Sequence, residues 1–276
     1  MKYKRIILSL LLVLFIFSFA EAQKRKKKRD LSRPDTTTIS PAATQQPSPQ
    51  AATPTPSSES KVQDAQDSDR MNTLLKMYAL GFRYYDLTVS QMALYEMIAM
   101  DLDNVSLRDS LALLYYNMGK YGSAIAVATD VLAVEKNNLA MLEVKALSNE
   151  SLQFYNDALN DYEKLYLLSP SPYLLYKMAT LQYTTKKQEQ TKTNIAILLN
   201  NSEIDSLTVD VPVNRAQQQQ VPLRAAVLNL RGLLYQDLGN KEEAKKSFAE
   251  ALKLSPDYRA AKANQEALAK AAPKKK

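Results

Sequence analysis

The side chains able to do chemistry in this sequence are hydroxyls, amides, lysines and carboxylates, because the chain has no Cys and no His. Histidine is the most versatile acid–base group and the commonest metal ligand, and cysteine is the usual thiolate nucleophile. The closely spaced acids Asp101/Asp103 and Glu242/Glu243 fall at expected helix ends or starts, where solvent and the helix dipole account for them. The sequence shows no phosphate-binding glycine loop and no nucleophile elbow. We therefore predict no catalytic residue, no metal site, no cofactor, no small-molecule substrate and no enzymatic activity.

Tyrosine is the prominent functional side chain, with 16 in a chain of 276 residues. It combines a large contact area with one hydrogen bond at a low entropy cost, and it therefore recurs in recognition surfaces. Some of these tyrosines are expected to pack between helices as core instead, namely Tyr115, Tyr121, Tyr162 and Tyr235. This chemistry favours a binding surface.

Small residues that recur at a fixed spacing predict the helices that position these tyrosines. The first set is Gly81, Ala112, Ala146, Ala179 and Gly232, and twelve residues after each comes Ala93, Ala124, Ala158, Thr191 and Ala244. The first set is separated by 31, 34, 33 and 53 residues. Two antiparallel helices that cross closely need small side chains at the crossing, with apolar residues at three- and four-residue steps filling the groove. The pattern therefore predicts stacked helix pairs from residue 71 onward.

The last unit resembles the tetratricopeptide repeat family. Gly232, Tyr235, Gly239, Ala244, Phe248, Ala251 and Pro256 stand where that family's signature places them. The unit around Ala112 is similar, whereas Asn149 and Gln182 replace the expected tyrosine in the third and fourth units. The resemblance implies an all-α fold, a right-handed α-solenoid of about five helix pairs over residues 71–272. A capping helix at 259–272 would cover the open end.

In that family the first helix of each pair lines a concave face that binds a protein or peptide. The residues expected on this face are the candidate partner-binding residues: Tyr78, Phe82, Tyr85, Tyr116, Asn117, Tyr176, Tyr183, Asn229 and Gln236. The family's best-known peptide site clamps a terminal carboxylate with Lys, Arg and Asn. Tyr78, Phe82 and Leu113 occupy the corresponding positions here, so such a ligand is not expected.

An insertion at about 201–222 lengthens the gap between the fourth and fifth units. Leu207, Val209, Val211 and Val213 alternate with polar residues and Pro212, which is an extended pattern restricted to a sheet edge. The sequence leaves two alternatives: a loop lying over the solenoid, or a projecting strand or hairpin that a partner's sheet could extend.

The first seventy residues predict export and a tether. Residues 1–22 have the pattern of a secretory signal peptide, with a basic start, an apolar run at 6–19 and cleavage expected before Gln23. Residues 23–70 combine the basic run Lys24–Arg29 with a Pro/Ser/Thr/Gln-rich linker that is expected to be disordered. The alternative is an uncleaved inner-membrane anchor, since more basic residues follow the apolar run than precede it.

The net charge of +7 comes from the chain's ends. Acidic and basic residues are nearly balanced over 71–273, whereas the run at Lys24–Arg29 and the tail at 273–276 are basic. The basic run could contact an anionic envelope surface, and no nucleic-acid partner is expected. The sequence thus predicts an exported, periplasmic protein-interaction scaffold or adaptor of the cell envelope. Alternatives are a membrane-anchored scaffold and a glycan-binding helical-repeat protein.

Overall fold

A computed structural model describes residues 58–214 and 217–270. The predicted signal peptide, the basic run and the tail at 273–276 lie outside these residues. The chain divides into one unit up to Asn72 and a second from Thr73 onward. Within the described residues, no helix is both long enough and apolar enough to cross a membrane.

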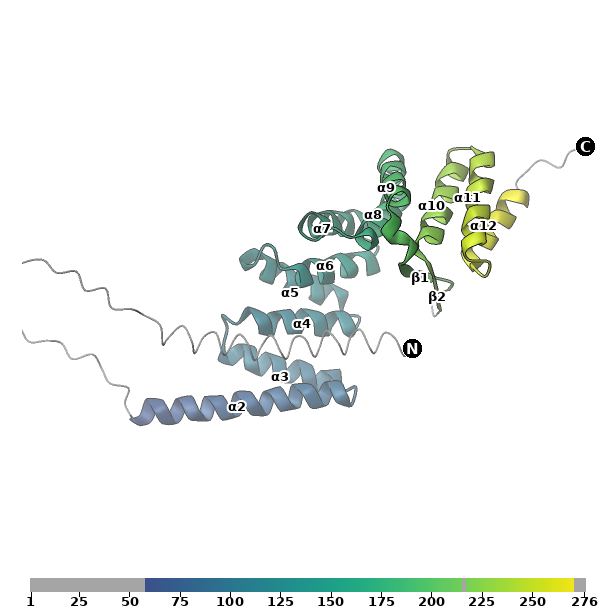
Figure 1. The fold of residues 1–276 in the computed structure, drawn as a ribbon. Coiled ribbons are helices and arrows are strands. Elements are labelled where there is room, and N and C mark those ends of the chain that lie inside the picture. The colour runs from purple at the N-terminus through teal and green to yellow at the C-terminus, as the bar shows by residue number, and fades with distance from the viewer. Residues whose placement is uncertain (1–57, 215–216, 271–276) are drawn as a thin grey trace, which may run out of the picture. The chain divides into compact units, whose positions relative to one another are not determined.

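The second unit consists of helices that follow one another as packed antiparallel neighbours (Figure 1). They are α2 (Ser58–Arg83, from Thr73 in this unit), α3 (Leu87–Met100), α4 (Val105–Asn117), α5 (Tyr121–Val134), α6 (Leu139–Ser151), α7 (Tyr155–Leu168), α8 (Pro172–Thr184), α9 (Gln188–Asn200), α10 (Leu223–Asp237), α11 (Lys241–Leu254) and α12 (Arg259–Lys270). Over the described residues this confirms an α-solenoid of five helix pairs with a C-terminal capping helix.

The small residues lie at the helix crossings, as the spacing predicted. Ala112, Ala124, Ala146 and Ala158 are each 0% exposed. The crossing at Gly232 is tight, because a Cβ atom there would lie 2.4 Å from the Phe248 ring of α11. The crossings therefore require side chains of this size.

The first unit uses a different frame from the one the sequence suggested. In each pair, the turn after the first helix contains a residue in the left-handed region of backbone dihedral angles. In the later units this residue comes seven positions after the small residue at the crossing, and in the first unit it is Tyr85: the later ones are Gly119, Gln153, Lys186 and Gly239. Seven positions before Tyr85 is Tyr78, which lies 34 residues before Ala112, and its partner twelve residues later is the buried Ser90. The Ser90 hydroxyl donates to the Tyr78 carbonyl at 2.9 Å. The equivalent positions are thus Tyr78 and Ser90, not Gly81 and Ala93.

Buried polar pairs take the place of the missing tyrosines. The Asn149 amide donates to Asp161 at 3.0 Å, and the Asn194 amide donates to Gln182 at 2.8 Å. Both pairs join the two helices of one unit at the same spacing of twelve residues. A buried amide needs such a partner, because an unsatisfied polar group is costly.

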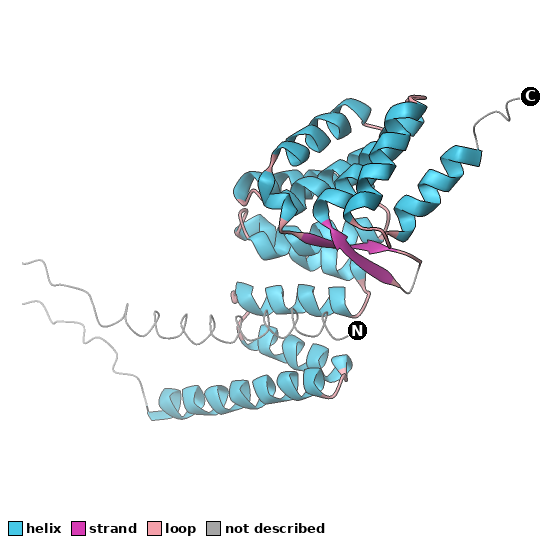
Figure 2. Ribbon diagram, turned by 45° about the vertical axis from the view of Figure 1, so that its right-hand side comes forward, coloured by secondary structure: helices cyan, strands magenta, loops and turns pink. Residues whose placement is uncertain are grey.

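The insertion forms an antiparallel hairpin (Figure 2). Strand β1 (Thr208–Pro212) pairs with β2 (Gln218–Pro222), with Asp210 opposite Gln220. The alternating valines bury one face, since Val209, Val211 and Val221 join the core around α10. A short 3₁₀ helix, Ser202–Asp205, buries Ile204 in the same core. The β pattern is confirmed, and the hairpin packs against the solenoid instead of projecting freely.

Helix α2 begins at Ser58, inside the segment expected to be a disordered linker. Good helix formers and local bonds such as Gln63 to Asp67 at 3.1 Å support it. The side chains from Val62 to Arg70 are exposed, so this part of the helix has little core of its own.

Candidate functional site

The candidate site is a row of side chains at the last turn of successive first helices. Four positions after each small residue stand Tyr116 on α4, Glu150 on α6, Tyr183 on α8 and Gln236 on α10. In the corrected frame Phe82 of α2 holds the same position. Helix α4 contacts α6, and α8 contacts α10. The repeat geometry therefore brings these side chains onto one face.

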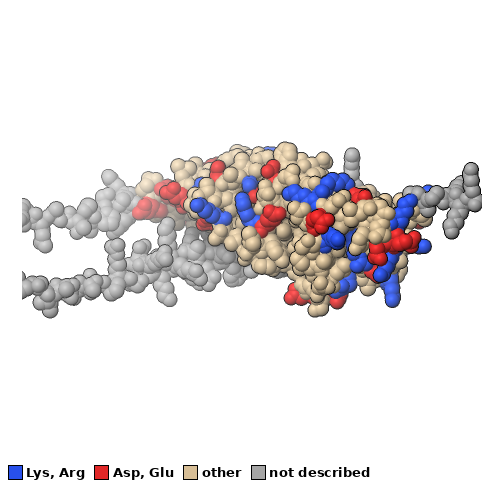
Figure 3. Space-filling model, turned by 90° about the horizontal axis from the view of Figure 1, so that it is seen from above, with Lys and Arg blue, Asp and Glu red and all other residues tan. Residues whose placement is uncertain are grey.

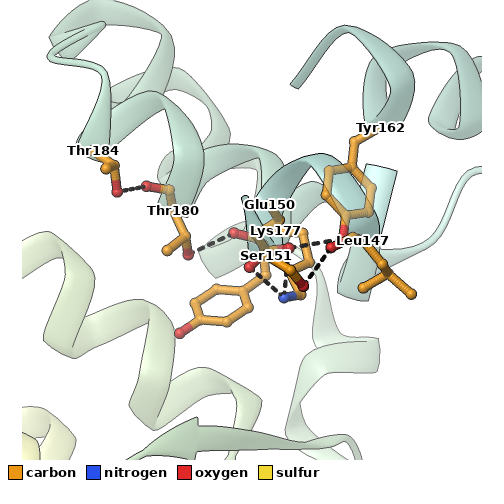
Figure 4. A network of polar contacts seen from close by, with 8 residues as sticks. Leu147, Glu150, Ser151, Tyr162, Lys177, Thr180 and Thr184 are labelled. Carbon is orange, nitrogen blue, oxygen red and sulfur yellow. Dashed lines mark hydrogen bonds and ion pairs between the residues drawn. The ribbon is translucent and has the colours of Figure 1, made fainter. Parts of the chain in front are cut away.

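An ion-pair network fixes the middle of this row (Figure 4). The Lys177 ammonium of α8 donates to both carboxylate oxygens of Glu150, at 2.9 and 3.1 Å. The Tyr162 hydroxyl of α7 donates to the same carboxylate at 2.9 Å. Burial, and then the charge of Glu150, raises the pKa of Tyr162, so its hydroxyl stays protonated and remains a donor. Glu150 is thereby held in one position between two units.

Tyrosines flank this network. Tyr116 packs beside Tyr121 with ring centroids 5.7 Å apart. Tyr173, at the start of α8, is 42% exposed. Burial raises the pKa of both hydroxyls, and the charges of Glu150 and Glu143 raise them further. Tyr116, Glu150 and Tyr173 lie on α4, α6 and α8, the first helices of three successive units, and their hydroxyl and carboxylate groups suit hydrogen bonding and aromatic contact with a ligand.

At the N-terminal end, the structure separates the predicted residues. Tyr78 and Phe82 pack edge to face at 5.1 Å. Burial raises the pKa of Tyr78 to about 12. Tyr85 lies in the turn after α2 with φ of 61° and is 74% exposed, because the frame of this unit differs from the expected one. Asn117 is exposed at the end of α4.

Toward the C-terminus, several of the predicted side chains already contact other residues of this chain. Tyr176 packs against the core around α10. Asn229 is buried and accepts a hydrogen bond from Asn264 of the capping helix at 2.9 Å. Tyr183 lies 5.3 Å beneath the Lys186 ammonium, and Gln236 is half-buried. Of the nine predicted residues, Tyr116 holds the position on α4 that Glu150 holds on α6, and Asn229 faces α12.

Sequence reasoning overlooked Tyr173 and Lys177. Both lie on α8 at four-residue spacing, so their common face could have been found. The pairing of Lys177 with Glu150 joins residues 27 positions apart, and Asn138 donates to Asp109 across a similar separation at 3.1 Å. Polar residues separated along the sequence by slightly fewer positions than one repeat are therefore the signal for side chains that meet across units.

A separate cavity of about 360 Å³ lies among α5, α6 and α7. Its buried carboxylate, Asp161, accepts from Lys145 and from Asn149, each at 3.0 Å. These polar groups satisfy one another, and the exposed side chains of Phe154, Asp157, Asn160 and Lys164 line the rest of the cavity, which therefore opens to solvent. Across the described residues, no group of three or more acidic, His or Cys side chains could hold a metal ion.

Charges of both signs are intermixed on the face of the described residues that Figure 3 shows. The acidic and basic side chains lie among each other there, as the nearly balanced composition of residues 71–273 suggested. This face therefore offers alternating charge rather than one broad field.

Comparison with known proteins agrees with this geometry. Residues 225–258 match the tetratricopeptide repeat profile. A tetratricopeptide repeat protein from Parabacteroides merdae is 18% identical, with a TM-score of 0.59 over 72% of each chain. A MamA structure from Desulfovibrio magneticus RS-1 is 12% identical, with a TM-score of 0.55 over 69% of this chain and 98% of the other. A further MamA structure has a TM-score of 0.55 at 13% identity, over 70% of this chain and 97% of the other. A comparison with curated proteins gave no match.

Proposed function

The chain is a tetratricopeptide repeat protein, and on that premise we propose that it binds a protein or peptide partner on the face formed by α4, α6 and α8. The observation that carries this proposal is the Glu150–Lys177–Tyr162 network (Figure 4). The exposed Tyr173 lies on the same helix as Lys177, and Tyr116 lies at the last turn of α4. The network orders a polar centre before any ligand arrives, and such pre-organisation lowers the cost of binding.

The chemistry of the face suits a peptide. Tyr173 offers an exposed ring and a neutral hydroxyl, and Glu150 is held in place by two donors. Aromatic anchors around a fixed polar group are typical of residues that dominate binding energy at interfaces. The non-enzymatic scaffold role is part of the same proposal.

The proposal is tested by selecting peptides from a random display library on the full chain and measuring their affinities for variants. The Tyr116→Ala/Tyr173→Ala double variant should weaken the selected peptides about tenfold or more, as loss of aromatic anchors does. Tyr84→Ala is the matched control, because Tyr84 is an exposed tyrosine in the turn after α2. Equal affinity of wild type and double variant, with circular dichroism unchanged, would reject the proposal.

We further propose that this scaffold works in the cell envelope, as an exported and periplasmic protein. The support is the sequence pattern of residues 1–22, with the Lys24–Arg29 run offering an electrostatic contact to an anionic surface. N-terminal sequencing of the protein isolated from its cells tests this. A mature start near Gln23 is expected, whereas a start at Met1 would favour the inner-membrane anchor.

A further inference from the structure

The β-hairpin has an outer edge with free main-chain groups. The Leu223 amide donates to the Leu207 carbonyl at 2.8 Å, and the Val213 amide donates to the Gln217 carbonyl at 2.9 Å. Bonded and non-bonded pairs alternate in an antiparallel ladder, so Thr208 and Asp210 turn their N–H and C=O groups away from β2. Among the described residues, no main-chain group from outside the hairpin bonds to them. Such an edge is a template for another strand.

The two edges of the hairpin differ in their surroundings. The segment before α12 lies beside β2. The side-chain amide of Gln219 donates to the main-chain carbonyl of Asp257 at 2.9 Å, and the main-chain N–H of Arg259 donates to the side-chain oxygen of Gln219 at 3.1 Å. On the side of β1, the outward main-chain groups of Thr208 and Asp210 have no such neighbour bonded to them among the described residues. The edge of β1 is therefore the one open to an added strand.

A second copy of this chain is a poor occupant for that edge. Antiparallel pairing of β1 with itself about its centre would set Asp210 opposite the same residue of the other copy, and facing like charges destabilise a ladder. Pro212 has no N–H to donate at the end of the strand. These features resemble the devices by which edge strands avoid self-pairing.

The charges favour a basic occupant. Asp210 is exposed, and its carboxylate has no ion-pair partner in the described part of the chain. A Lys or Arg side chain on an added strand would meet Asp210 and pair with its carboxylate.

We propose that β1 accepts an extended, basic segment of a partner protein as a third strand of the hairpin sheet. Thr208 and Asp210 would exchange main-chain hydrogen bonds with it, and Asp210 would select for a cationic side chain. This deepens the proposed function by naming the partner's conformation and charge, and it rests on that function.

The test uses a short labelled peptide in which Lys and Thr alternate, with fluorescence anisotropy on the full chain. Two further probes separate the contributions: the same peptide N-methylated at alternate residues, and a version with Glu in place of Lys. We expect the basic peptide to bind, the N-methylated peptide to bind about fivefold or more weakly, and the acidic peptide not to bind. Equal binding of the methylated and unmethylated peptides would overturn strand addition.

Matched proline variants identify the edge. Asp210 and Gln220 lie opposite each other, and each turns its N–H outward. Asp210→Pro should weaken the basic peptide about tenfold, Gln220→Pro should leave it within about twofold, and Asp210→Asn should show the effect of charge alone. If both proline variants bind as wild type does, the proposal fails.

The same anisotropy assay distinguishes failure of the strand pairing from failure of the proposed binding face. Loss of peptide binding in Tyr116→Ala/Tyr173→Ala, with no loss in Asp210→Pro, would keep the aromatic face and remove the strand pairing. Loss in Asp210→Pro alone would keep the strand pairing and remove the aromatic face.

Discussion

At the scale of single residues, Gly232 shows how strictly the helix crossings limit side-chain size. Alanine normally stabilises a helix by about 1 kcal/mol relative to glycine. Here its Cβ would lie 2.4 Å from the ring of Phe248, which is fully buried and cannot move away freely. Gly232→Ala should therefore lower the free energy of unfolding by about 1–3 kcal/mol in urea denaturation followed by circular dichroism.

Gly122 provides the matched control, since it lies in helix α5 and a methyl group added there would have nothing within 4 Å. Gly122→Ala should leave stability unchanged or raise it by up to about 1 kcal/mol. Adding Phe248→Leu to Gly232→Ala should recover part of the loss, because two residues in contact do not act additively. Destabilisation by both alanine substitutions alike would contradict the crossing argument.

Asp109 on α4 makes stability depend on pH. It is 8% exposed, and burial raises its pKa to about 6, although the hydrogen bond from Asn138 opposes that rise. An unfolded aspartate titrates near 3.9. Between about pH 4 and pH 6 the folded state therefore binds more protons than the unfolded state, and its stability increases as the pH falls.

Asp109→Asn should remove this dependence. Relative to wild type, the variant's free energy of unfolding should fall by about 2 kcal/mol when the pH is lowered from 7 to 4. Asp130→Asn, on an exposed residue of α5, reports the general effect of removing one negative charge. A difference between Asp109→Asn and wild type that does not vary with pH would show that Asp109 is not the group responsible.

At the scale of elements, the hairpin is part of the core. Val209 and Val211 of β1 are 5% and 6% exposed and pack with the residues of α10. Val209→Ala/Val211→Ala should lower the free energy of unfolding by about 2–4 kcal/mol, from lost burial and the cavities left behind. Gln218→Ala/Gln220→Ala, on the exposed face of β2, should cost well under 1 kcal/mol. Similar losses in both double variants would mean that the hairpin face does not carry core packing.

The sequence predicted those elements whose signals repeat along it. Slim residues at Ala112, Ala146 and Ala179 recur near the repeat length, and alternating valines marked β1. The first unit misled because Gly81 is a small residue close to the expected spacing, whereas the left-handed turn at Tyr85 places Tyr78 and Ser90 at the equivalent positions. A helical period gives the face of one helix, but it does not give the neighbour that the face meets.

The candidate site was less predictable for the same reason. Tyr116 follows from helical spacing, because it lies four positions after a small residue. The contact of Glu150 with Lys177 depends on how two units stack, and the burial of Asn229 depends on where the capping helix lies. These are relations between elements, and one sequence does not state the angle and shift between them.

At the scale of the whole described solenoid, stability should be unevenly distributed. The core around α10 joins residues from α8, α9, the hairpin, α11 and the start of α12. A smaller core links α6, α7 and α8. Because each unit of a solenoid contacts only its neighbours, its stability is a sum of local and nearest-neighbour contributions. Amide hydrogen exchange should therefore be slowest in α9 and α10.

The same reasoning predicts how damage spreads from Gly232. Gly232→Ala weakens the contact of α10 with α11, so exchange should accelerate in α10, α11 and α12, measured by mass spectrometry on peptic peptides. Helices α4 and α5 share no contact with the altered crossing and should keep their wild-type rates. Exchange that accelerates equally in every helix would instead mean that the solenoid unfolds as one cooperative body, and the nearest-neighbour description would not apply to this chain.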